Sequence, residues 1–349
     1  MSASATADSL LNTRGESRSL DAFVVAAAFE RGGRFSAFAL GDGTLRIVEG
    51  LGQSEWRSQP VHAGAVLALA PDARPGGFVS GGDDGAFRRT DATGEVAEIA
   101  RFGSRWVEQV ASHAGAAKSG GLLAASVGKT IHLFDAAGTP LRKFDHAATV
   151  SGIAFDAKGK RIAASHYNGV SLWFVGAKDA SPRELEWKGS HIGLAIHPEG
   201  EAVVSAMQEN ALHGWRLSDG QHLRMSGYPA KTESLSFSRR GKWLATSGAD
   251  AIILWPFFGG GPMGKAPLEL AGGDGVLCTR VACHLEQDAV AGGFADGLVV
   301  LADIDKGRIL PVAAPGRGAV SALAWSPDGT RLAFGTETGF AAIVDFAKR

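Results

Sequence analysis

The chain has 349 residues and carries 35 Lys and Arg against 36 Asp and Glu, which gives a formal net charge of −1 at pH 7. This balance argues against a nucleic-acid partner, because phosphate binding usually requires a basic surface. The two cysteines exclude a disulfide framework, and the longest apolar run, residues 22–29, is too short to cross a membrane. We therefore expect a cytoplasmic protein with neither a nucleic-acid nor a membrane partner.

The N-terminus differs in composition from the rest of the chain. Residues 1–8 are small and polar, so we expect a disordered tail there. Residues 1–20 contain no apolar core and no early basic cluster, which argues against a secretory signal. From residue 9 to residue 349, one continuing repeat pattern predicts a single domain.

Short predicted strands recur through this domain at a fixed spacing. The last repeat, 318–346, predicts three antiparallel strands with turns at Ser326–Gly329 and 337–339. Within it, Trp325 and Thr338 lie 13 residues apart along the sequence. The same interval separates Phe29 from Asp42, Phe155 from Asn168, Phe237 from Asp250, and Cys283 from Asp296. Repeats of about 40–45 residues with four strands each are typical of a β-propeller.

The repeats also share particular residue types at matching places. These are His, Ser, an acid or amide in a turn, and Trp: His62, Ser80, Asp84, His146, Asn168, Trp173, Trp215, Asp250, Trp255 and Asp296. In these residues the chain resembles the WD40-repeat family, in its small bacterial single-domain form, over residues 22–349. The resemblance implies a propeller in which His62 and His146 hydrogen-bond the turn acid or amide of their repeats. No repeat holds the complete set.

The predicted first strands of the repeats number eight. They lie near 24–29, 65–70, 106–112, 150–155, 192–197, 233–238, 276–283 and 320–325. We therefore expect an all-β, eight-bladed propeller of four-stranded antiparallel blades, with seven blades as the alternative. The last repeat ends without a fourth strand, so ring closure needs a strand from the N-terminus, which the repeat spacing places near 10–16.

Four predicted loops in the middle of the chain are rich in aromatic and charged residues. They are 165–168, 187–191, 207–210 and 227–231, on one rim of predicted blades four to six, and both tyrosines of the chain lie in them. Interfaces favour such combinations, so we hypothesise a non-catalytic scaffold that binds a protein or peptide partner on this rim. The contact residues of this hypothesis are His166, Tyr167, Trp187, Lys188, His191, Gln208, Glu209, Tyr228 and Lys231. The structural alternative is that they only cap loops and plug the central hole.

Two other functions remain open from the sequence. His166, His191 and Glu209 are residue types that bind Zn²⁺, and the resemblance to small bacterial WD40 proteins implies an association with metal homeostasis. An enzyme with a site in the central channel is a more distant alternative, because no arrangement of nucleophile, base and acid stands out.

One segment matches the start of a phosphate-binding loop. Gly259–Lys265 has the glycine and lysine spacing of that motif, but Ala266 and Pro267 follow where a Ser or Thr would hold Mg²⁺. The segment also joins two predicted strands instead of opening a helix. We therefore expect no bound nucleotide, and no cofactor.

Overall fold

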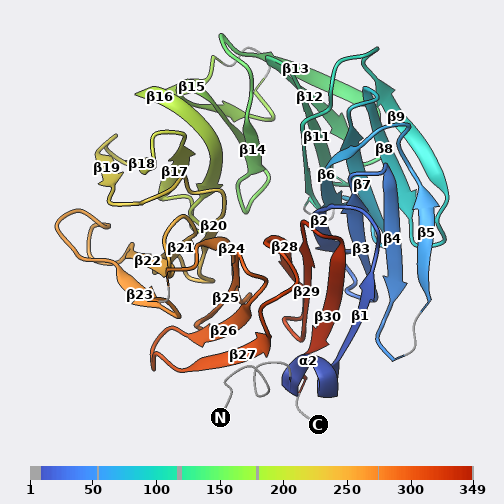
Figure 1. Ribbon diagram of the computed structural model, residues 1–349. Helices are drawn as coiled ribbons and strands as arrows, with labels where there is room; N and C mark the ends of the chain where they lie inside the picture. Colours follow the sequence, from blue (N-terminus) through green and yellow to red (C-terminus); the bar gives the residue numbers. More distant parts are fainter. Residues whose placement is uncertain (1–8, 53–54, 116–119, 178–180, 274, 348–349) are drawn as a thin grey trace.

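The structure is a computed structural model that describes residues 9–52, 55–115, 120–177, 181–273 and 275–347. Within these residues the strands form seven antiparallel sheets, six of four strands and one of six. Figure 1 shows the sheets arranged around a common axis, so the molecule is an all-β, seven-bladed propeller. The expected N-terminal tail, residues 1–8, lies outside the described residues.

Three four-stranded sheets follow one another at the start of the ring. The first contains β2 (Val24–Phe29), β3 (Phe35–Leu40), β4 (Thr44–Glu49) and β5 (Trp56–Pro60). The second contains β6 (Val66–Pro71), β7 (Gly77–Gly82), β8 (Ala86–Asp91) and β9 (Val96–Arg101). The third contains β10 (Gln109–His113), β11 (Leu122–Val127), β12 (Thr130–Asp135) and β13 (Pro140–Asp145).

The six-stranded sheet comes next and is followed by three more four-stranded sheets. It contains β14 (Gly152–Phe155), β15 (Arg161–Phe174), β16 (Arg183–Ile196), β17 (Ala202–Met207), β18 (Ala211–Arg216) and β19 (His222–Met225). Then come β20 (Leu235–Phe237), β21 (Trp243–Thr246), β22 (Ile252–Pro256) and β23 (Leu268–Leu270), and next β24 (Cys278–Cys283), β25 (Ala289–Phe294), β26 (Val299–Asp303) and β27 (Ile309–Ala313). The last sheet contains β28 (Val320–Trp325), β29 (Arg331–Thr336), β30 (Phe340–Asp345) and β1 (Gly15–Ser19).

The expectation of eight blades is wrong, and the alternative of seven is confirmed. The predicted fourth and fifth repeats join into the six-stranded sheet because β16 runs without interruption for 14 residues. In its first half Leu185 pairs with Val170 of β15, and in its second half Leu194 pairs with Ser205 of β17. The last strand of one repeat therefore continues directly as the first strand of the next.

The ring is closed by the two ends of the chain, which meet in Figure 1 as a blue strand beside a red one. β1 pairs antiparallel with β30, with Gly15 opposite Val344. A closing strand from the N-terminus is thus confirmed, but it begins later than expected, because most of 10–16 forms the short helix α2 (Ser9–Arg14). α2 packs against β27 and β30 and buries Leu11.

The core lies between neighbouring sheets. Phe38, Phe78 and Phe334 are completely buried, although each belongs to a different sheet. Rings also meet across sheet boundaries: the centroids of Phe87 on β8 and Phe134 on β12 lie 5.5 Å apart. Each sheet can bury both faces because it has a neighbour on each side. No helix in the described part of the chain is long and apolar enough to cross a membrane.

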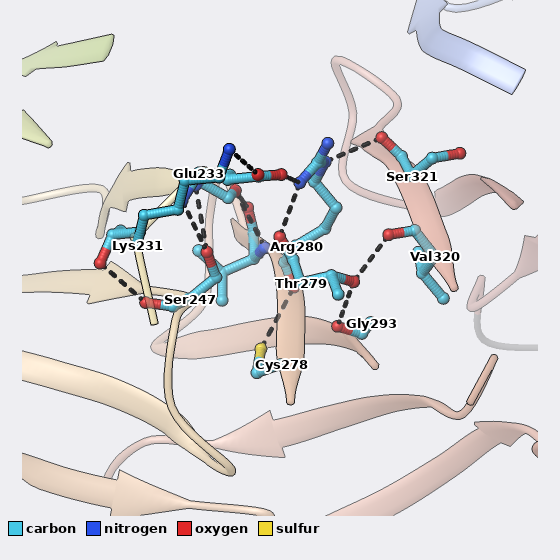
Figure 2. A network of polar contacts seen from close by, with 12 residues as sticks. Lys231, Glu233, Ser247, Cys278, Thr279, Arg280, Gly293, Val320 and Ser321 are labelled. Carbon is cyan, nitrogen blue, oxygen red and sulfur yellow. Dashed lines mark hydrogen bonds and ion pairs between the residues drawn. The ribbon is translucent and has the colours of Figure 1, made fainter. Parts of the chain in front are cut away.

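Hydrogen bonds also join the first strands of neighbouring sheets, as Figure 2 shows for β24 and β28. The Thr279 hydroxyl donates to the Val320 carbonyl at 2.6 Å, and Arg280 Nε donates to the Ser321 carbonyl at 2.8 Å. The Ser321 hydroxyl continues this chain of contacts to the Val24 carbonyl of β2 at 2.5 Å. The contacts fix the orientation of adjacent sheets, including the closing one.

We expect a chain that begins at Asp21 to lose much of its stability. The truncation removes β1 and α2, and with them the burial of Leu11 and Leu20, which are 4% and 6% exposed. Two buried leucines account for about 3–6 kcal/mol of unfolding free energy. Urea denaturation measures the difference, with a chain that begins at Ser9 as reference. Equal midpoints for the two chains would contradict closure by β1.

Candidate functional site

Two of the four predicted rim loops are strands. Residues 165–168 lie inside β15 and residues 187–191 lie inside β16, and Tyr167 pairs with Ser190 between them. The expectation of loops is therefore wrong there, although the β15–β16 register shifts between Tyr167 and Gly169 and gives Asn168 and residues 187–189 no cross-strand partner. Residues 208–210 do form a turn, between β17 and β18, and 227–231 connect β19 to β20.

The two strands border an open pocket of about 1050 Å³, which we call the β15–β16 groove. It also reaches the connection between β13 and β14. Four of the predicted contact residues line it: His166, Tyr167, Trp187 and Lys188. The other lining residues are Asp145, His146, Ala147, Asn168, Ser171, Glu184 and Glu186. The groove is therefore the place where the structure brings predicted site residues together.

Alternation along β16 places its charged side chains on one face. Successive residues of a strand point to opposite faces, so Glu184, Glu186 and Lys188 share one face while buried Leu185 lies on the other. The Ser171 hydroxyl donates to Glu184 Oε2 at 2.8 Å from the opposite strand. These glutamates were missed from the sequence, although their period-two spacing was visible there.

The two predicted histidines are buried and internally bonded. His166 Nδ1 lies 2.9 Å from the Tyr167 carbonyl and its Nε2 lies 2.8 Å from Ser171 Oγ. His191 is completely buried, with Nδ1 2.6 Å from Ser205 Oγ and Nε2 2.8 Å from the Trp187 carbonyl. Both rings thus hold the strands that frame the groove in place.

The metal alternative has no supporting geometry. Within the described residues, no group of three or more His, Cys, Asp or Glu side chains is arranged to hold a metal ion. Both nitrogens of His166 and of His191 already face protein partners, and Glu209 accepts from the backbone N–H of Ser190 at 3.0 Å. His166, His191 and Glu209 therefore do not form the predicted zinc site.

The remaining predicted contact residues lie outside the groove. Gln208 and Glu209 are exposed in the turn that follows β17, and the Gln208 backbone N–H donates to the Ser190 carbonyl at 2.9 Å. Lys231 lies in the connection before β20, where Figure 2 shows it with Glu233 and with Arg280 of β24. Its Nζ is 3.1 Å from Glu233 Oε1, and Arg280 Nη1 donates to Glu233 Oε2 at 3.0 Å.

Tyr228 is a structural residue, and the expectation that it contacts a partner is not supported by its position. It is 8% exposed, its hydroxyl lies 2.6 Å from Thr246 Oγ1, and it accepts from Trp255 Nε1 at 2.6 Å. Burial raises the pKa of Tyr228 to about 12. The hydroxyl is therefore neutral and satisfied inside the sheet.

Of the two histidines at repeat positions, one matches the expected contacts and one departs from them. His62 Nδ1 lies 2.9 Å from Asp84 Oδ1 and its Nε2 lies 2.9 Å from Ser80 Oγ, as the resemblance implied. His146 Nε2 instead accepts from Trp173 Nε1 at 3.0 Å, and its Nδ1 faces the Lys129 carbonyl at 3.2 Å. Burial is the main cause that lowers the pKa of both rings.

The other repeat positions also have local structural roles. Trp215 is buried and its Nε1 donates to the Glu186 carbonyl at 3.4 Å. Asp296 Oδ1 accepts from the backbone N–H of Leu298 at 2.9 Å within a turn. Asn168 has a φ of 73° and lies at the register shift of β15 between Tyr167 and Gly169, and Asp250 is exposed in the turn before β22.

In two neighbouring repeats, a His or Tyr side chain accepts a hydrogen bond from the tryptophan N–H of its repeat, and Lys188 occupies the matching position in the repeat between them. His146 lies 27 residues before Trp173, and Tyr228 lies 27 residues before Trp255. Lys188 stands at the same interval before Trp215. Since a lysine cannot replace that ring, Trp215 turns its N–H to the β16 backbone and the Lys188 side chain stays exposed beside the groove.

Trp187, which lines the groove, is held by residues of β18 and β19. Its ring stacks on His213 with centroids 4.0 Å apart, and the guanidinium carbon of Arg224 lies 4.3 Å from its centroid. His213 Nε2 lies 2.8 Å from His222 Nδ1. Burial, with His222, His191 and Arg224 nearby, lowers the pKa of His213 to about 3, so this ring is neutral at pH 7.

The segment that resembles a phosphate-binding loop has a different role. Gly259–Lys265 connects β22 to β23, and Lys265 Nζ donates back to the carbonyl oxygens of Phe258 and Gly259. The Met263 sulfur accepts from the backbone N–H of Arg224 at 3.2 Å. The segment therefore spans two neighbouring sheets, and its lysine points at its own loop.

Comparisons with known proteins give similarity at low identity. No family model matches the chain. It is similar to autophagy-related protein 16 of Arabidopsis thaliana, with 22% identity over 314 residues that cover 86% of this chain and 59% of that protein. It is also similar to telomerase protein component 1 of Mus musculus, with 27% identity over 206 residues, or 56% of this chain and 7% of that protein. The chain thus spans less than two thirds of the length of either relative.

Among solved structures, the chain is similar to the computationally designed protein Ika8. The two align with a TM-score of 0.74 at 22% identity, over 94% of this chain and 98% of that one. This similarity shows the fold, a β-propeller.

We expect Tyr228→Phe to lower the free energy of unfolding by about 1–3 kcal/mol, because it leaves the buried Trp255 N–H without its acceptor. Tyr167→Phe is the matched control, since Tyr167 is 54% exposed, and it should change the stability by less than about 0.5 kcal/mol. Urea denaturation of both variants tests this. Unchanged stability in Tyr228→Phe would contradict the structural role.

We expect stability to fall with acidification partly through His213. The pKa of His213 is about 3 in the folded chain against 6.5 for the free group, so between these values the unfolded chain binds a proton that the folded chain does not. The free energy of unfolding is therefore unaffected by this group above pH 6.5 and falls as the pH is lowered from 6.5 toward 3. His213→Gln should reduce the slope of unfolding free energy against pH by up to about 1.4 kcal/mol per unit in that window. Urea titrations at several pH values measure the slope. Identical slopes would show that His213 does not titrate in this way.

Proposed function

We propose that the chain is a non-catalytic interaction scaffold of the cytoplasm, a WD40-like propeller that binds a protein or peptide partner in the β15–β16 groove. The observation that carries this proposal is the composition of the groove. It combines an exposed tyrosine and a tryptophan with exposed acidic and basic side chains, on strands that are paired on both sides.

The groove lies on strands of the sheet, which favours binding. Its walls are β15 and β16 instead of free loops, and His166 and His191 bond the strands internally. A surface that is already ordered loses little conformational freedom when a partner binds. Trp187 is similarly held by His213 and Arg224.

The imidazoles of the groove support a non-catalytic role. A general base needs a ring nitrogen that can reach a substrate proton. Both nitrogens of His166 lie within hydrogen-bond distance of Tyr167 and Ser171, and those of His146 lie within that distance of Lys129 and Trp173. Proton transfer through either ring would therefore break a bond that holds the site together.

The comparisons are compatible with this proposal at the level of the fold. Autophagy-related protein 16 aligns over most of this chain, but its name does not identify a binding partner. The partner of this chain is thus proposed from the groove itself, and the WD40 assignment from the repeat residues, such as His62 with Asp84 and Ser80.

We expect Tyr167→Ala to weaken the retention of a partner by about 1–3 kcal/mol, because an exposed aromatic at the centre of a contact is typical of binding hot spots. The matched control is Phe174→Ala, since Phe174 lies on the same strand and is also 54% exposed but does not line the groove. Tagged variants are purified from the lysate of the native cell and their co-purifying proteins are quantified.

Both variants must first melt at the temperature of the wild type. A partner that both retain equally would place the contact elsewhere on the propeller. Loss in both variants would indicate a general change in the six-stranded sheet instead of a contact at Tyr167.

A further inference from the structure

The acidic groups of the β15–β16 groove are only partly compensated. Asp145 Oδ1 accepts from the Thr130 hydroxyl at 2.7 Å, and Glu184 accepts from Ser171. Glu186 forms no ion pair or side-chain hydrogen bond within the described residues, and no ion pair joins it to Lys188. The groove therefore holds three carboxylates against one lysine.

A glycine lies directly opposite Glu186 on β15. Gly169 is the cross-strand partner of Glu186, so no side chain from β15 faces it. A Cβ atom at this glycine would lie 2.3 Å from the Leu185 carbonyl oxygen, and its φ of 148° is rare for other residues. The backbone thus keeps this position free of a side chain, and the Glu186 carboxylate remains accessible from the groove.

The aromatic wall is also suited to a cation. The chain already places its own Arg224 guanidinium carbon 4.3 Å from the Trp187 ring centroid, which is the distance of a cation–π contact. Tyr167, which is 54% exposed, has no cation within such a distance among the described residues. A ligand can supply the cation at this second ring.

We propose that the β15–β16 groove binds an extended peptide segment through a Lys or Arg side chain that lies between Tyr167 and the carboxylates of Glu184 and Glu186. The proposal rests on the proposed scaffold function and specifies the chemistry of its partner. A pocket of about 1050 Å³ exceeds a single side chain, which is why a peptide segment fits better than a free amino acid. Charge complementarity favours the basic partner over an acidic one.

Selection from a random nonapeptide library displayed on phage tests this chemistry. The baits are the wild-type chain, Tyr167→Ala, the double variant Glu184→Gln/Glu186→Gln, and Glu269→Gln as a matched control. Glu269 is an exposed glutamate on the last strand of the neighbouring sheet, so its change removes a similar charge outside the groove. Peptides retained by the wild type and the control but lost on the double variant should be enriched in Arg and Lys.

The outcomes separate the two proposals. If the peptides that depend on the groove show no enrichment in Arg and Lys, the scaffold function stands and the inference of a basic partner is overturned. If peptides are selected but none depends on Tyr167, Glu184 or Glu186, both proposals fail. The same holds if no peptide binds at all.

A second measurement isolates the charge. A selected arginine peptide with a fluorescein label is compared with its citrulline version, which keeps the shape of the side chain and removes the charge. Fluorescence anisotropy should show about tenfold weaker binding of the citrulline peptide and a similar loss for the arginine peptide on Glu186→Gln. Added salt should weaken only the arginine complex. Equal affinities of the two peptides would overturn the inference.

Discussion

The closed ring is the constraint on which the rest of the structure depends. Each sheet buries both faces only because a neighbour covers it on each side, and a ring with a missing strand would expose one of these faces to water. The pairing of β1 with β30 supplies the last contact, and Leu20 beside it packs with Val24 and Phe38 of the first sheet. Strand pairing and apolar packing thus join the chain ends in one place.

Within this ring, the continuous strand β16 distinguishes one sector from the others. Because it serves two repeats, it carries the groove-facing residues Glu184, Glu186 and Lys188 in its first half and the buried His191 in its second. A recognition surface is therefore built on paired strands, at the point where two repeats merge. Gly169 on the opposite strand presents no side chain to Glu186 and lets the two backbones approach closely.

Much of the fold was predictable because turn chemistry and strand alternation are local. The turn at Ser326–Gly329 forms as expected, with the Gly329 N–H donating to the Ser326 carbonyl at 2.8 Å. The number of blades was not predictable, since the continuity of β16 depends on backbone bonds between segments that no residue type marks. In the site, Tyr167 and Lys188 were found from the sequence and line the groove, but burial removed His191 and Tyr228 from the surface.

The role of Tyr228 could have been found from spacing alone. It precedes Thr246 by 18 residues and Trp255 by 27, the intervals that separate His62 from Ser80 and His146 from Trp173. Glu184 and Glu186 could not have been assigned this way, because only the pairing register shows which residue faces them. The register also has a consequence for biosynthesis. A ribosome makes β1 before the other strands of the propeller and β30 after them, so the nascent propeller remains an open arc until β30 has emerged, and only then can the final pairing form.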